Sequence, residues 1–197
     1  NLSITNITHI ISIMSPILIS FFLIMSSIFN QDVKGIIFIM GAMMAMVVNV
    51  IAMNLIKQKR DENEAFACNI FDIPFMTKYN SPSPSSVFIS FSMVYILLPM
   101  IFNKNINIPV IIFFLSLLLI DSYSKVLKRC TNFLGAFMGI ALGSILGALW
   151  YSLFKSSGNS ALLYYDELKS NTSICNKPSR QTFKCRVFKN GELLGAQ

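Results

Sequence analysis

The sequence is poor in charged residues. Only 13% of its 197 residues are charged and 54% are hydrophobic, whereas an ordinary soluble domain has roughly 25% charged and 45–50% apolar residues. A single small core cannot bury that excess of apolar side chains. The composition therefore argues against a soluble domain and favours apolar runs of about 20 residues, the length that crosses about 30 Å of hydrocarbon.

Cysteine is also scarce. Its four residues, Cys68, Cys130, Cys175 and Cys185, are too few and too scattered for a disulfide scaffold or a zinc site with paired ligands, and we expect no metal and no cofactor. No Lys or Arg precedes the first apolar run, which argues against a cleaved signal peptide. The net charge of +7 is divided between loops and tail. This distribution is typical of the basic flanks of membrane spans and offers no continuous face for nucleic acid.

Five apolar segments are candidates for membrane spans. They cover residues 9–29, 35–56, 85–102, 106–120 and 133–154. The fourth is shorter than a full crossing, so it must be extended by its neighbours or cross a thinned bilayer. We predict an all-α integral membrane protein of five transmembrane helices, with six as the alternative. The bundle should cover residues 1–154, and a polar, basic tail should cover residues 155–197.

Glycines recur at intervals of four in the fifth apolar segment. Gly135, Gly139, Gly143 and Gly147 form the small-xxx-small pattern that lets another helix approach closely. This helix should therefore be buried in the bundle or at an oligomer contact. In the tail, Asn190-Gly191 predicts a tight β-hairpin. A single hairpin is too short to be stable without a packing partner.

Basic residues are distributed unequally between the two sides of the predicted bundle. Loops 57–84 and 121–132 share one side and carry seven Lys and Arg residues, whereas the short loops opposite carry only Lys34 and Lys104. The positive-inside rule places the two large loops in the cytosol and the tail in the lumen or outside. A lumenal tail would suit a disulfide between Cys175 and Cys185, with two free thiols as the alternative.

Two segments on that basic side resemble motifs of one enzyme family. Ser124-Lys125, Thr131 and Gly135, followed by the glycine-stepped helix, resemble the last motif of the phosphatidic acid phosphatase type 2 superfamily, S-R-x-x-x-x-x-H-x-x-x-D. Pro82-Ser83-Pro84-Ser85-Ser86 opens the third span much as the family's P-S-G-H-S motif opens its own helix. The order, the spacing and the side of the membrane agree, and the resemblance covers residues 57–154.

The resemblance implies the family's fold without its chemistry. In the family, one histidine attacks phosphorus, an aspartate orients it and a second histidine protonates the leaving group. The corresponding positions here are Thr131, Gly135 and Ser85. Lys125 replaces an arginine and can attract a phosphate, but it cannot hold one with a bidentate fork. Because a nucleophile without its base is a poor catalyst, we expect that the chain is not an enzyme.

These observations predict a structural or scaffolding membrane protein. The alternative is a divergent lipid phosphatase or a lipid-binding protein, with the single histidine, His9, near the motif loops. A small channel or transporter comes third, because no carboxylate falls inside a predicted span. The abundance of Ile, Asn, Lys and Ser indicates an AT-rich genome, and the ending PSRQTFKCRVFKNGELL is similar to the tails of membrane proteins of large nucleocytoplasmic DNA viruses. That similarity implies the internal membrane of a virion, with capsid or neighbouring membrane proteins binding the loops and tail.

Overall fold

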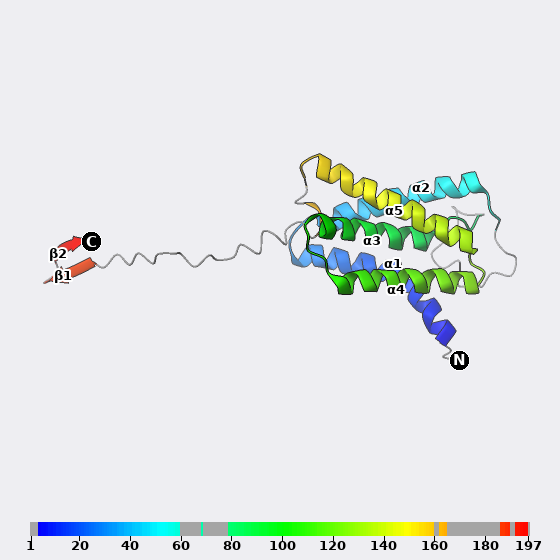
Figure 1. Ribbon diagram of the computed structural model, residues 1–197, viewed down its shortest axis with the longest axis horizontal. Helices are drawn as coiled ribbons and strands as arrows, with labels where there is room; N and C mark the ends of the chain where they lie inside the picture. The colour runs from blue at the N-terminus through cyan, green and yellow to red at the C-terminus, as the bar shows by residue number, and fades with distance from the viewer. Residues whose placement is uncertain are drawn as a thin grey trace. The chain divides into compact units, whose positions relative to one another are not determined.

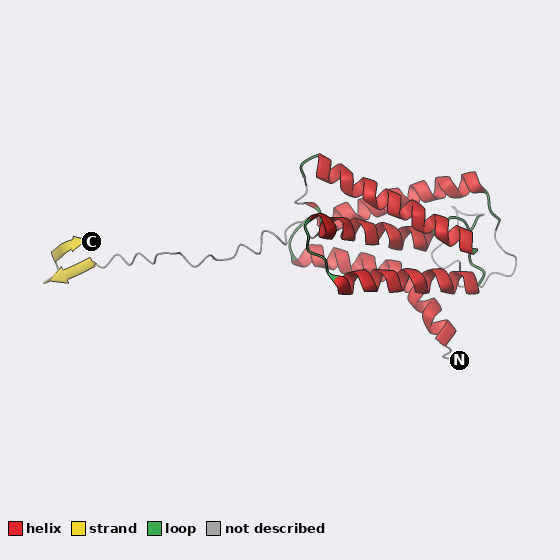
Figure 2. Cartoon of the chain, in the orientation of Figure 1, coloured by secondary structure: helices red, strands yellow, loops and turns green. Residues whose placement is uncertain are grey.

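A computed structural model describes residues 4–59, 68, 79–159 and 162–164, and the backbone of residues 186–189 and 192–196. Within these residues the bundle consists of five α-helices: α1 (Ile4–Phe29), α2 (Lys34–Ile56), α3 (Pro84–Phe102), α4 (Ile108–Leu127) and α5 (Phe133–Ser156) (Figures 1 and 2). All five are long and apolar enough to cross a membrane. The predicted all-α, multi-pass membrane protein is therefore confirmed.

The fourth helix differs most from its predicted bounds. α4 has 20 residues and continues past Ile120 to Leu127, so it includes Asp121 and Ser124. The helix continues because the Asp121 carboxylate is buried and accepts hydrogen bonds from hydroxyl groups of neighbouring helices. It does not mark a hydrated loop. The prediction that no carboxylate lies inside a span is therefore wrong.

Helix α3 lies at the centre of the bundle and contacts each of the other four helices (Figure 1). Pro84 occupies its first turn, where the missing N–H has no intrahelical acceptor and the fixed φ suits a helix. Most of the residues that follow Pro84 in the first half of the helix are buried, among them Val87, Ile89 and Phe91. Burial on every side is typical of a helix surrounded by other helices.

The glycines of α5 lie against α3. All four are buried. A Cβ atom added at Gly139 would lie 2.9 Å from the Ser83 carbonyl oxygen, and one added at Gly147 would lie 2.7 Å from the Phe91 carbonyl oxygen. Real Cβ atoms do not come this close, so the α3–α5 contact, hereafter the glycine seam, depends on the absence of side chains.

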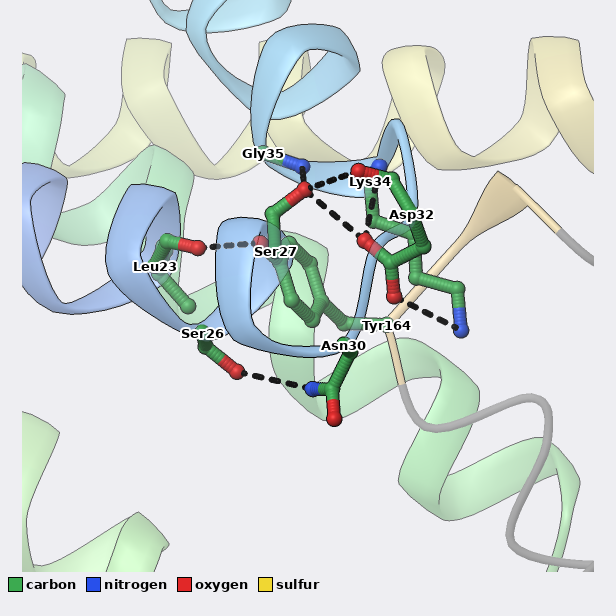
Figure 3. Close-up of polar contacts among 8 residues, drawn as sticks. All are labelled: Leu23, Ser26, Ser27, Asn30, Asp32, Lys34, Gly35 and Tyr164. Carbon is green, nitrogen blue, oxygen red and sulfur yellow. Dashed lines mark hydrogen bonds and ion pairs between the residues drawn. The ribbon is translucent and has the colours of Figure 1, made fainter.

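A polar turn connects the C-terminal end of α1 to the start of α2. The Ser27 hydroxyl donates to Asp32, at 2.6 Å from its carbonyl and 2.8 Å from its carboxylate oxygen, and accepts from the Gly35 N–H (Figure 3). The Tyr164 hydroxyl donates to the Leu23 carbonyl oxygen at 2.6 Å. Burial, and secondarily the charge of Asp32, raises the pKa of Tyr164 to about 12. The chain after α5 thus folds back onto α1, and the bundle extends beyond the predicted boundary at residue 154.

The C-terminal unit, Leu168–Gln197, is distinct from the unit Asn1–Glu167. In it, β1 (Arg186–Lys189) pairs antiparallel with β2 (Glu192–Ala196), and Lys189 lies opposite Glu192. These strands flank the Asn190-Gly191 pair from which a hairpin was predicted. Cys175 and Cys185, the predicted disulfide partners, lie outside the described residues.

Candidate functional site

The two motif segments meet at the end of the bundle where α3 and α5 begin. The Ser83 backbone N–H donates to the Gly135 carbonyl oxygen at 3.1 Å. The Thr131 hydroxyl donates to the Asn80 carbonyl oxygen at 3.0 Å, and the Asn132 side chain accepts from the Gly135 N–H at 2.7 Å, which caps α5. Segments about 50 residues apart in sequence are thus bonded to each other through their backbones.

A buried carboxylate joins three helices beside these segments. Asp121 of α4 is fully buried, and its Oδ1 accepts from Ser12 of α1 at 2.6 Å. On α3, Ser85 donates to both carboxylate oxygens at 2.8 and 2.7 Å, and Ser86 donates to Oδ2 at 3.0 Å. We call these four residues the Asp121 staple. Hydrogen bonds to a charged group stabilise by about 1.5–3 kcal/mol each, so this cluster fixes α1, α3 and α4 together.

A small cavity adjoins the staple. It measures about 160 Å³ and is lined by residues of α1, α2, α3 and α4 and by Cys68 and Cys130. Most of its walls are apolar, and we call it the polar cavity after His9, Ser85 and Lys125, which also line it. The His9 Nδ1 atom lies 3.4 Å from the Ser124 hydroxyl. The His9 Nε2 atom is buried and has no hydrogen-bond partner among the described residues. His9, expected at the membrane boundary, is therefore an inward-facing residue of this cavity.

A disulfide between Cys68 and Cys130 links the α2–α3 and α4–α5 connections, and both cysteines line the polar cavity. Their separation of 62 residues left no local sequence signal for the pairing. Disulfides persist in oxidising compartments. The positive-inside rule, however, assigns this end to the cytosol. The disulfide and the charge pattern therefore indicate opposite orientations.

The catalytic positions of the resembled family hold structural contacts here. The Ser85 hydroxyl is bonded to Asp121 and the Thr131 hydroxyl to a backbone carbonyl. A Cβ atom added at Gly135 would contact the Thr131 hydroxyl and would lie 2.8 Å from the Ser81 hydroxyl. The space for the family's aspartate is therefore filled. Thr131 and Gly135 do not line the polar cavity.

The remaining motif positions divide between the cavity and the helix packing. Lys125 lines the polar cavity, and Ser124 lies beside His9. The Ser83 hydroxyl is buried without a partner among the described residues, while its backbone precedes α3. The structure thus brings Ser85, Ser124 and Lys125 to one site and leaves Thr131 outside it.

Sequence reasoning missed the residues that define the site. Asp121 was assigned to a loop, and nothing in the sequence distinguishes Ser12 from Ser15 and Ser20, whose hydroxyls bond carbonyl oxygens of their own helix. One signal was present: a fourth span that stopped at Ile120 was too short to cross. Extending it through Asp121 supplies the missing length and places a carboxylate inside the bundle.

No protein-family model, curated protein or solved structure matches the chain. The resemblance to lipid phosphatases therefore rests on the motif residues alone. Among the described residues, no group of three or more His, Cys, Asp or Glu side chains could hold a metal ion. The helices described above make the chain a multi-pass membrane protein.

Proposed function

We propose that the chain is a structural membrane protein that keeps a lipid-phosphatase-like arrangement of motifs without catalysis. The observation that carries this proposal is that the two motif hydroxyls are engaged in hydrogen bonds within the protein. Ser85 and Thr131 hold Asp121 and the Asn80 carbonyl, respectively. Groups that a hydrolase would keep free for substrate are used here to join helices and connections.

The surroundings of Thr131 support the same conclusion. An activated hydroxyl nucleophile needs a base within about 2.6–3.2 Å. The hydrogen-bond acceptor of Thr131 is a carbonyl oxygen, which cannot take up a proton at neutral pH, and the only histidine, His9, pairs with Ser124. A base for Thr131 is therefore lacking among the described residues.

The first test is phosphate release by the purified protein in vesicles of phosphatidic acid, and separately with pyrophosphate. We expect no release above vesicles alone, for the wild-type protein and for Thr131→Ala alike. Turnover by the wild-type protein that disappears in Thr131→Ala would overturn the proposal. Ser116→Ala, whose exposed hydroxyl bonds within its own helix, serves as the matched control.

The scaffolding role assigns partner binding to the tail and loops. Residues 155–197 carry seven basic and three acidic side chains, which suits an acidic protein surface such as a capsid or a neighbouring membrane protein. A virion's internal membrane is the setting that the resemblance of the C-terminal ending to viral membrane proteins implies. Deleting residues 170–197 should prevent incorporation into that assembly while the helical bundle stays folded. Unchanged incorporation would refute the partner role.

Binding of a lipid headgroup is a second candidate function, favoured by the polar cavity. His9 Nε2 and the Lys125 ammonium are potential donors to a phosphate oxygen. Equilibrium binding of short-chain phosphatidic acid should weaken in Lys125→Gln and His9→Ala, and should persist in Lys104→Gln, an exposed basic residue of the α3–α4 loop. Equal binding by all three variants would exclude the cavity as the site.

A further inference from the structure

A second, larger hollow lies on the membrane-spanning surface between α1 and α4. Its volume is about 590 Å³, and we call it the α1–α4 groove. Its floor includes Ile19, Leu23 and Phe114, which are buried, and its rim includes Leu18 and Phe22, which are exposed. The remaining lining residues are Ile11, Ser15, Phe21, Ile96, Val110, Phe113 and Leu117.

The groove is about as long as one bilayer leaflet is thick, and along α1 it lies across the middle of the Ile7–Phe29 span. Along α1 it extends from Ile11 to Leu23, which at 1.5 Å per residue is about 18 Å. Half of a hydrocarbon core is about 15 Å. One end stops beside the Ser12 contact of the Asp121 staple. The other end lies near Leu23 and Val110, toward the end of the bundle where Tyr164 docks.

The walls of the groove offer nothing for a polar ligand to recognise. Ser15 is its only polar lining residue, and the Ser15 hydroxyl donates to the Ser12 carbonyl oxygen at 2.9 Å. The lining residues of the groove belong to three membrane spans, α1, α3 and α4, where the surrounding medium is hydrocarbon and water is excluded. Its occupant must therefore be apolar.

The lining side chains do not suit another helix. Helices that associate in membranes use small residues at the contact, as the glycine seam does. The α1–α4 groove is instead lined by branched aliphatic and aromatic residues and contains no glycine or alanine. A crossing helix would therefore find no surface in this groove for close approach of its backbone.

We propose that the α1–α4 groove binds one acyl chain of a bilayer lipid, from the leaflet nearest Tyr164. A single extended chain matches the length of the groove and its walls, which are apolar except for Ser15. The Asp121 staple sets the inner limit of the site, because it closes the α1–α4 contact where the groove ends. This inference concerns a surface separate from the polar cavity and does not depend on the presence or absence of catalysis.

The test uses phosphatidylcholine vesicles whose lipid carries a photoreactive diazirine in the acyl chain. The full chain is reconstituted, irradiated and digested, and the labelled peptides are identified by mass spectrometry. We expect label concentrated on α1 residues 11–23 and α4 residues 110–117. Label spread evenly over the lipid-facing sides of all helices, including Phe137 of α5, would overturn the proposal without reference to any variant.

Two substitutions that fill the groove sharpen the test. Leu18→Trp and Leu117→Trp place bulk inside it, and Leu119→Trp is the matched control on α4, because Leu119 is exposed and does not line the groove. We expect both filling variants to lose most of the label and the control to retain it. Unchanged labelling in the filling variants, or a changed oligomeric state with unchanged labelling, would exclude an acyl-chain site.

Discussion

The glycine seam between α3 and α5 and the Asp121 staple among α1, α3 and α4 join helices in opposite ways. At the seam, side chains are missing, and the helices approach to backbone contact. At the staple, side chains reach across the helices, and one carboxylate binds hydroxyls from α1 and α3. The seam extends along α5 from Gly135 to Gly147, about half of the helix, whereas the staple is centred on one residue of α4.

Both kinds of contact follow from the lipid that surrounds the helices. Lipid tails are as apolar as leucine, so helices in a bilayer associate through close packing and hydrogen bonds. The glycine seam uses close packing along its whole length. The α1–α4 pair uses hydrogen bonds at one end, and the remainder of that contact widens into the α1–α4 groove. Backbone-to-backbone packing therefore closes the α3–α5 contact, whereas the α1–α4 contact leaves a groove at its surface.

Filling the seam should have the largest effect. A Cβ atom at Gly143 would contact the Val87 carbonyl oxygen and the Ser90 hydroxyl, so Gly143→Leu forces the two backbones apart. We expect a loss above about 3 kcal/mol, at the upper end of overpacking costs, and failure to form a compact bundle. Thermal unfolding followed by size-exclusion chromatography in detergent measures this effect.

The control for the seam is Ala141→Leu on the same helix, because Ala141 is exposed to the membrane side. Its unfolding should stay within about 0.5 kcal/mol of wild type. If Gly143→Leu unfolds at the wild-type temperature, then α5 does not pack on α3 through its glycines, and the contrast between the two contacts disappears.

Removing the carboxylate of the staple should have the next largest effect. Asp121→Ala leaves the hydroxyls of Ser12, Ser85 and Ser86 without their shared acceptor in a buried site. We expect destabilisation of about 3 kcal/mol, measured by unfolding in detergent. Ser12→Ala should cost less, because two α3 hydroxyls still bind the carboxylate. Equal stability of Asp121→Ala and wild type would show that the staple does not hold these helices.

The seam could be predicted from sequence and the staple could not. A glycine at every fourth position has one physical meaning on a helix, since it leaves one face without side chains. The partners of Asp121 lie 35 to 109 residues away, and serine is common in spans because its hydroxyl can return to its own backbone. Only the fold shows that Ser12 bonds to Asp121 while Ser15 bonds to its own helix.

The disulfide between the connections shows the same limit. The predicted pair, Cys175 and Cys185, lies outside the described residues and stays a prediction. The bond in the described structure joins Cys68 to Cys130 across 62 residues. Composition and periodicity report on neighbours along one element. They carry no information on which loops meet above a bundle.

The covalent link outside the bundle should have the smallest effect of the three. Loop-closure entropy for a 62-residue separation predicts about 4 kcal/mol for a fully unfolded chain. We expect about 2 kcal/mol for Cys130→Ser, within the usual range for a disulfide, because helices that persist in detergent already restrict the unfolded chain. Unfolding of the variant in detergent provides the value.

Electrophoresis tests whether this bond forms and which orientation is correct. In a Cys175→Ser/Cys185→Ser background, cells are lysed with an alkylating reagent and the protein is run with and without reductant. We expect reductant to slow the band when Cys68 and Cys130 are both present, and to have no effect once Cys130→Ser is added. Since disulfides persist in oxidising compartments, that result places this end outside the cytosol, against the charge pattern. Two free thiols in the parent background would instead support the positive-inside orientation and leave the glycine seam and the Asp121 staple as the contacts that hold the bundle.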